Sequence, residues 1–236
     1  MYRFRILGLL LCIAMLAKVH YVEASSCTRL ADRMPPLSEC MEEETPCFCT
    51  MAGDWFTRLR ALYVLPNDSS GALSTIPDSG VSVHPAWTGE FDFGYMFTQN
   101  LGFELILSTT KHTLMGTKSL AGVEIGTTWL LPPTFTLQWR FLPSYRVQPY
   151  FGAGANYTLF YWNDCDLPDT HMHLSHSWGA ALQGGVDLFF YKDWLFNLDV
   201  KYVWIDTKAT LTGLIPGTVH VDINPWLFGF GIGRKW

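Results

Sequence analysis

The sequence contains few charged residues and no long apolar run beyond its N-terminal region. Only 16% of its 236 residues are charged, whereas 15% are aromatic. No later apolar segment reaches the roughly 20 residues that a membrane-spanning helix requires. The formal net charge is −5 and no basic run is present, which argues against nucleic acid as a partner.

The chain also lacks a recognisable catalytic motif. His84 and His112 lie near the expected outer rim, and no nucleophile motif or serine–acid constellation can be assembled around them from the sequence alone. We therefore do not expect an enzyme, and nothing in the sequence calls for a cofactor.

Strict alternation is the strongest signal that is present. In the segment Pro225 to Trp236, one face carries large apolar residues: Trp226, Phe228, Phe230, Ile232 and Trp236. The other face is mostly glycine, which suits the crowded inside of a narrow barrel. The aromatic face then needs an apolar solvent. Lipid is the natural one, because outer-membrane barrels commonly end on such a strand.

The N-terminus directs the chain out of the cytoplasm. Arg3 and Arg5 precede an apolar run over residues 6–17, and small residues before Ser25 offer a cleavage site. We interpret residues 1–24 as a signal peptide, 25–53 as a periplasmic cysteine-rich extension, and 54–236 as the barrel. An uncleaved anchor and a lipoprotein signal at Cys27 are the alternatives.

Eight alternating segments follow Asp54, over residues 55–64, 84–97, 101–112, 128–141, 148–162, 177–190, 194–205 and 219–236. An even number of strands can close up and down. The connections alternate between long and short, and short turns face the periplasm in such barrels. The sequence thus predicts an all-β, eight-stranded antiparallel up-and-down transmembrane β-barrel with both ends in the periplasm.

Five blocks of sequence resemble one family. They are LPPTFTLQWRF (131–141), PYFGAGANYT (149–158), SWGAALQGGVD (177–187), WIDT (204–207) and NPW (224–226). In this order they resemble the outer-membrane protein W (OmpW) family, from about Gly53 to the C-terminus. The resemblance implies an eight-stranded barrel in the outer membrane of a Gram-negative bacterium that passes small hydrophobic molecules, and some members are bacteriocin receptors. The cysteine-rich segment and the loop 163–176 depart from the family pattern.

The inward faces of the strands predict a divided lumen. Charged residues form a floor: Arg58, Arg60, Glu90, Asp92, Glu104, Arg140, Asp187, Asp199, Lys201 and Lys235. Apolar residues form the outer wall: Leu62, Ile106, Leu130, Phe160, Trp162, Val203, Ile223 and Leu227. Enclosed charges persist only with partners, so we interpret the floor as an ion-paired plug, against a titrating or ion-conducting role. The wall predicts a pocket for apolar guests, against mere packing.

Pro132 and Pro133 predict an irregular strand, because neither residue can donate a ladder hydrogen bond. Unpaired backbone is costly in lipid, so a wall defect there is unusual. The functional interpretation is lateral release of solute into the membrane, and the alternative is a harmless irregularity near the rim.

The cysteines and loop histidines raise further candidates. Cys27, Cys40, Cys47 and Cys49 precede the first strand in an oxidising compartment, so we expect disulfides among them rather than a metal site. A surface loop carries Cys165, His171, His173 and His176. His171 and His173 alternate with apolar residues as in an ordinary strand, which favours an exposed polar loop over a metal site.

The sequence as a whole predicts an outer-membrane barrel that admits small hydrophobic compounds through an apolar outer lumen. An open aqueous pore of the porin type is not expected, because eight strands enclose little more than their own side chains or one small ligand. The partners would be outer-membrane lipid and small hydrophobic solutes. The alternative is a solute-inert structural barrel, or a receptor whose extracellular loops bind a surface ligand. The sequence does not specify an oligomeric state.

Overall fold

The computed structural model describes residues 48–236, and these residues are all-β. The strands are β1 (Trp55–Leu65), β2 (Ser69–Ser70), β3 (Ser79–Val83), β4 (Ala86–Met96), β5 (Leu101–Ser108), β6 (Thr110–Lys118), β7 (Glu124–Leu131), β8 (Thr134–Arg140), β9 (Val147–Cys165), β10 (Thr170–Leu174), β11 (Ser177–Tyr191), β12 (Trp194–Val203), β13 (Asp206–Gly213), β14 (Gly217–Asp222) and β15 (Trp226–Lys235). In this part of the chain, no helix has the length and apolar character needed to cross a membrane.

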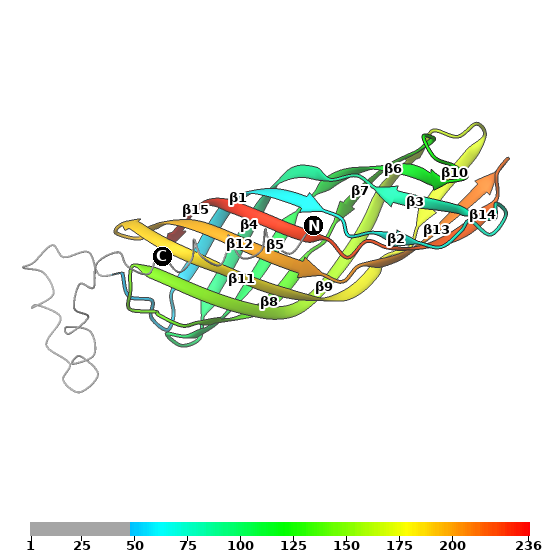
Figure 1. Ribbon diagram of the computed structural model, residues 1–236. Coiled ribbons are helices and arrows are strands. Elements are labelled where there is room, and N and C mark those ends of the chain that lie inside the picture. The colour runs from blue at the N-terminus through cyan, green and yellow to red at the C-terminus, as the bar shows by residue number, and fades with distance from the viewer. Residues whose placement is uncertain (1–47) are drawn as a thin grey trace, which may run out of the picture. The chain divides into compact units, whose positions relative to one another are not determined.

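Eight of these strands close into a ring in the order β11, β12, β15, β1, β4, β5, β8 and β9. Every pairing is antiparallel, and the ladder from Ser177↔Thr158 to Leu188↔Val147 joins β11 back to β9. Figure 1 shows the resulting barrel of tilted strands. The predicted eight-stranded up-and-down barrel is therefore confirmed. We call the end with the short β4–β5, β8–β9 and β11–β12 turns the periplasmic end, and the opposite end the outer end.

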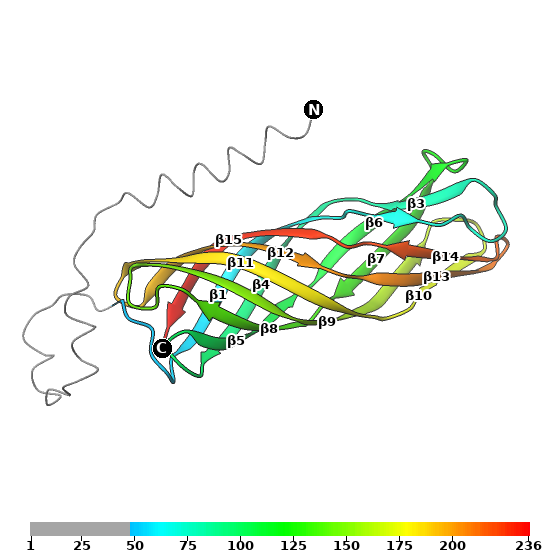
Figure 2. The same cartoon turned by 60° about the horizontal axis from the view of Figure 1, so that its bottom comes forward.

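Beyond the ring, the wall continues at the outer end as two separate sheets (Figures 1 and 2). One contains β3, β6, β7 and the distal part of β9, and the other contains β10, β13, β14 and β2. Side chains bridge the two edges between them: Val81 N donates to Ser70 Oγ at 2.7 Å, and Phe160 N donates to His176 Nδ1 at 3.2 Å. The long connections expected from the sequence are thus largely strand.

The outer surface of the ring is apolar along most of its length. The exposed side chains include Phe91, Phe135, Leu137, Trp139, Phe151, Phe196, Leu198, Phe228, Phe230 and Ile232. Neighbouring aromatic side chains stack on this surface, as in the pairs Phe103–Phe135 and Phe190–Phe196. An exposed apolar surface of this extent marks a lipid or partner contact, and on a closed barrel it fits lipid.

The glycines of β15 make room for long side chains inside the ring. A Cβ atom on Gly229 would lie 3.3 Å from Cδ of Arg60, and one on Gly233 would lie 2.9 Å from Cγ of Arg58. The lumen is therefore filled by the arginines of the neighbouring strand β1, which pairs with β15 through Arg60↔Gly231 and Arg58↔Gly233.

Candidate functional site

A network of buried ion pairs fills the lower half of the lumen. Arg60 lies at its centre: its guanidinium is 2.8 Å from Glu90 Oε1 and 2.6 Å from Asp92 Oδ2. The same group is 3.4 Å from Glu104 Oε1 and from Asp199 Oδ2. All five side chains are at most 1% exposed. Since water is excluded, each charge is compensated by its protein partners alone.

Three further cations complete the network. Arg58 contacts Glu104 and lies 2.7 Å from Asp187 Oδ2. Arg140 reaches the same Asp187 oxygen at 2.7 Å. Lys201 Nζ lies 2.8 Å from Glu90 Oε1 and 2.6 Å from Asp199 Oδ1. The network thus unites nine of the ten residues expected at the floor: Arg58, Arg60, Glu90, Asp92, Glu104, Arg140, Asp187, Asp199 and Lys201.

Lys235 does not join this network, so its assignment to the floor is wrong. It pairs with Phe56 in the ladder, one inward layer below Arg58. Its Nζ atom donates to the carbonyl of Cys49 at 2.6 Å and lies 3.7 Å and 3.8 Å from the carboxylates of Asp54 and Asp193. Alternation along β15 was enough to predict that Lys235 points inward. It could not predict how far along the barrel axis the residue lies, and the strand register places it at the periplasmic rim.

An apolar layer lies beneath the ion pairs and closes the periplasmic end. Its buried members are Phe56, Met96, Phe189 and Leu195, with Phe48 packed against them. The segment Phe48–Thr50 is fixed to the barrel by hydrogen bonds. Gln148 Nε2 donates to the Phe48 carbonyl at 2.8 Å, and Thr50 Oγ1 donates to Gln148 Oε1 at 2.7 Å. The last residues of the expected extension are therefore part of the barrel's lower seal.

An inner pocket of about 30 Å³ lies directly above the ion pairs. Glu90 and Lys201 form its base, while Leu62, Ile106, Val203 and Leu227 are among its apolar walls. Pro132 also lines it. Since about 10–15 Å³ of such volume holds one water molecule, this pocket can take a small chemical group.

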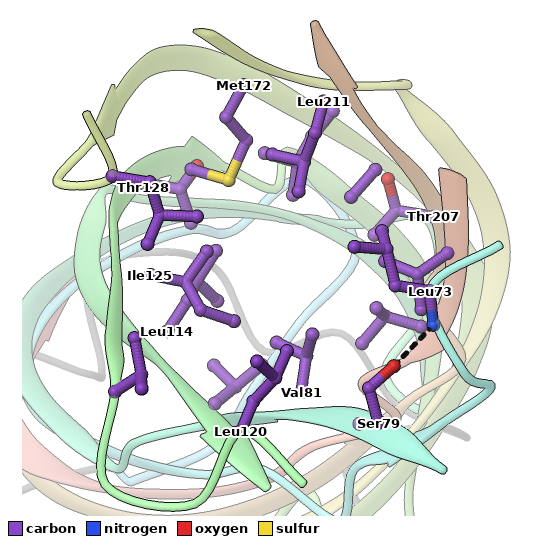
Figure 3. Close-up of a pocket in the computed structure, with 18 of the residues that line it drawn as sticks. Leu73, Ser79, Val81, Leu114, Leu120, Ile125, Thr128, Met172, Thr207 and Leu211 are labelled. Carbon is purple, nitrogen blue, oxygen red and sulfur yellow. Dashed lines mark hydrogen bonds between the residues drawn. The ribbon is translucent and has the colours of Figure 1, made fainter. Parts of the chain in front are cut away.

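A larger apolar cavity of about 70 Å³ lies between the two outer sheets. Figure 3 shows side chains from both sheets converging on it, among them Val81, Leu114, Ile125, Met172 and Leu211. Leu130 and Ile223 line both the outer cavity and the inner pocket, so the two spaces are stacked one above the other. Together they offer a slender apolar compartment.

Seven of the eight expected wall residues are buried inside the barrel: Leu62, Ile106, Leu130, Phe160, Val203, Ile223 and Leu227. Trp162 is the exception, because 62% of its surface is exposed, and its assignment to the lumen is wrong. A β-bulge causes this reversal. Trp129 pairs with Trp162 and Leu130 pairs with Phe160, so Tyr161 is an extra residue that inverts the alternation beyond it.

Most of the outer cavity was not predicted from the sequence. Leu73, Val81, Leu114, Ile125 and Leu211 line it from segments that were expected to be loops. Val219 and Val221 also line it; they lie in the last expected strand but were not assigned to the wall. A signal was available in the pairs Val219–Val221 and Met172–Leu174, which keep the period of two that a half-buried strand shows.

The wall is broken at the two prolines. β7 ends at Leu131 and β8 begins at Thr134. The ladder with the preceding strands stops at Ile106↔Thr134 and resumes at Thr110↔Leu130. On the other side the break is held closed, because Tyr157 N donates to the Pro133 carbonyl at 3.0 Å. The discontinuity therefore faces β5 and β6 only.

The cysteines and loop histidines that were considered as disulfide or metal-site candidates lie in different parts of the chain. Cys27, Cys40 and Cys47 lie outside the described residues, and Cys49 is buried at the periplasmic end, so the disulfides stay a prediction. His171 and His173 point outward from β10. Cys165 packs against the outer core. Within residues 48–236, no three His, Cys, Asp or Glu side chains gather where they could hold a metal ion.

The comparison with protein families matches this architecture. A family model described as the OmpW family covers residues 51–236. The chain belongs to the OmpW family. The resemblance seen in the sequence is thereby confirmed, and several of the similar proteins are named outer-membrane proteins. This chain accordingly resides in the outer membrane of a Gram-negative bacterium.

Several known proteins are similar to this chain over most of its length. "Uncharacterized outer-membrane protein y4mB" of Sinorhizobium fredii is 39% identical over 77% of this chain and 80% of its own length. "Outer membrane protein W" of Escherichia coli is 36% identical over 80% of this chain and 91% of its own. "Dibenzothiophene metabolism operon protein PahQ" of Pseudomonas aeruginosa is 30% identical over 62% of this chain and 70% of its own.

A solved structure extends the similarity to the fold. The crystal structure of the outer membrane protein OprG from Pseudomonas aeruginosa superimposes with a TM-score of 0.76 at 31% sequence identity. The match covers 80% of this chain and 99% of that chain.

Proposed function

We propose that this barrel admits small, slender hydrophobic compounds from the outside and releases them sideways into the outer membrane. The observation that carries the proposal is the stacking of two apolar spaces above a sealed floor. A guest enters the outer cavity between the two outer sheets, descends past Leu130 and Ile223, and reaches the inner pocket. The apolar lining favours guests that leave water readily.

The floor supports a lateral rather than an axial exit. A guest that continued downward would have to separate the ion pairs of Arg60 and Lys201 and then displace the layer around Phe56. Stripping a buried charge of its partner costs about 3–5 kcal/mol, and several would be stripped together. The inner pocket instead touches Pro132, where the ladder towards β5 and β6 is interrupted. The wall break is the easier way out.

The name of one relative adds independent support. PahQ is designated a dibenzothiophene metabolism operon protein. Dibenzothiophene is an apolar aromatic compound, so the name associates a similar protein with an apolar solute. We infer a related class of solute for this chain.

Adding a charge to the outer cavity should weaken the binding of an apolar guest. Val219 is buried in the cavity wall, whereas the neighbouring His220 points outward. A Val219→Asp carboxylate retains water that the guest must remove, so we expect binding of radiolabelled octane to weaken at least about tenfold. His220→Asp introduces the same carboxylate outside the cavity and should leave binding unchanged. Octane binding by purified protein in lipid nanodiscs measures both. Equal affinities in the two variants would contradict the apolar route.

Clamping the wall break should stop release while sparing entry. Leu105 and Phe135 pair just below the break on the outer surface, and Lys111 and Trp129 pair just above it. Disulfides at both pairs should reduce octane transfer from protein to vesicles about tenfold if the strands must part, and a reductant should restore it. A control disulfide at Leu198 and Phe230, which pair on β12 and β15, should have no effect. Unchanged transfer in the clamped protein would place the exit elsewhere.

A further inference from the structure

The inner pocket has one polar wall within its apolar surroundings. Ser108, Thr110 and His112 alternate along the third strand of the barrel, at the end of β5 and the start of β6. All three are more than nine-tenths buried and line the pocket, whereas Thr109 and Lys111 between them are exposed. The opposite side of the pocket is formed by Val203, Ile223 and Leu227 among other apolar residues.

These polar groups retain unused hydrogen-bonding capacity. His112 Nδ1 lies 2.8 Å from the carbonyl of His84, which can only accept, so Nδ1 carries a proton. In the neutral ring Nε2 is then an acceptor. The hydrogen bonds formed within residues 48–236 include none at this Nε2 or at the hydroxyls of Ser108 and Thr110. Buried polar groups usually have partners, so three together that face a pocket indicate a site for a polar ligand group.

The base of the pocket selects for a neutral group. Glu90 and Lys201 both line it and are paired with each other at 2.8 Å. An anionic group would face Glu90, and a cationic group would face Lys201. Burial would also cost either ion its hydration free energy. A neutral hydroxyl or carbonyl has less hydration free energy to lose, and it gains hydrogen bonds in the pocket.

The polar wall also lies beside the break in the barrel. Thr110 pairs with Leu130, the last ladder pair before the break, and Pro132 lines the same pocket. A ligand group held by Ser108 and Thr110 would therefore be positioned at the opening proposed for release.

We propose that Ser108, Thr110 and His112 bind the polar head of a neutral amphiphile, a hydroxyl or carbonyl group on an apolar chain. The inference rests on the proposed function, since the apolar chain occupies the outer cavity. A ligand hydroxyl donates to His112 Nε2 and accepts from Ser108 or Thr110, and a ligand carbonyl accepts from either hydroxyl. The preferred solutes are thus neutral alcohols, aldehydes or ketones rather than bare hydrocarbons or fatty-acid anions.

A matched ligand series tests this site in the full chain in lipid nanodiscs. The ligands are octane, 1-octanol and octanoate at pH 8, and the variants are Thr110→Val and His112→Leu. Thr110→Val keeps the side-chain shape and removes only the hydroxyl. We expect 1-octanol affinity to fall about threefold to tenfold in each variant, and octane affinity to stay the same or rise. The ratio of variant to wild type cancels each ligand's own affinity for water.

The outcomes separate this site from the transport route. Loss of 1-octanol affinity with unchanged octane affinity supports the polar wall. If octane binds, but wild type and both variants bind 1-octanol with the same affinity, the polar wall is overturned and the apolar route is retained. Octanoate binding more tightly than 1-octanol also overturns it. No octane binding to the wild-type protein overturns the proposed function itself. Thr212→Val, at an exposed site on β13 outside both pockets, is the control and should leave the preference for 1-octanol unchanged.

Discussion

Replacing Arg60 by methionine is expected to destabilise the folded barrel by about 3–5 kcal/mol, the usual cost of removing one partner from a buried ion pair. Among the described residues, Arg60 is the only basic group within 4.0 Å of the Asp92 carboxylate. No hydrogen bond satisfies either Asp92 oxygen in this part of the chain. The variant therefore leaves Asp92 as a buried charge without compensation, whereas Glu90 and Asp199 keep Lys201.

A second substitution should recover much of this loss. Asp92→Asn in the Arg60→Met background removes the stranded charge, so the double variant should be more stable than Arg60→Met alone. Urea unfolding of protein refolded into lipid vesicles measures both, and Lys208→Met, at an exposed site on β13, is the control. The same measurement on Asp92→Asn alone completes the comparison. If the stability lost by the double variant equals the sum of the losses in Arg60→Met and Asp92→Asn, the pairing of Asp92 with Arg60 is contradicted.

The charged floor was predictable because the side-chain period of a strand is two. Once the aromatic face of β15 was assigned to lipid, parity placed Arg58, Arg60 and Asp199 inside the barrel. The contacts between them were not predictable. They depend on which residues oppose one another across eight strands and on how far each long side chain reaches, as the isolation of Lys235 at the rim illustrates.

Local irregularities were the main source of error. One extra residue at Tyr161 turned Trp162 from the lumen to the outside, and the sequence contains no marker for that bulge. The break at Pro132 and Pro133 was predictable, because proline has no backbone N–H and cannot donate a hydrogen bond to the neighbouring strand. The alternation of inward and outward side chains therefore predicts orientation along a strand only up to the first bulge that the sequence does not reveal.

The outer cavity was missed for a different reason. Its strands are short, as in β3 and β10, and glycine, proline and polar residues separate them, so they resembled loops. Their apolar residues gain burial only when two sheets face each other, which is a tertiary effect. The polar wall of Ser108, Thr110 and His112 was overlooked for the same reason, because inward polar residues are visible as a group only beside the cavity they face.

A charge on the lipid-facing surface should prevent insertion in a way that a charge beyond the membrane does not. Phe228 lies on the outer face of β15 between Trp226 and Phe230, and it pairs with Val200 on β12 and Tyr63 on β1. Phe228→Arg should destabilise the inserted barrel by about 2–4 kcal/mol, because the guanidinium must leave water for hydrocarbon. Folding yield into phospholipid vesicles and urea unfolding measure the effect.

The matched control is Leu214→Arg. Leu214 is 69% exposed in the turn between β13 and β14 at the outer end, where water is accessible on all sides. The same change from an apolar residue to arginine should therefore be nearly neutral there. Phe228→Leu, which keeps an apolar side chain, should also insert normally, so lost ring packing is separated from the cost of charge. Equal insertion by Phe228→Arg and Leu214→Arg would mean that the aromatic face of β15 does not contact lipid.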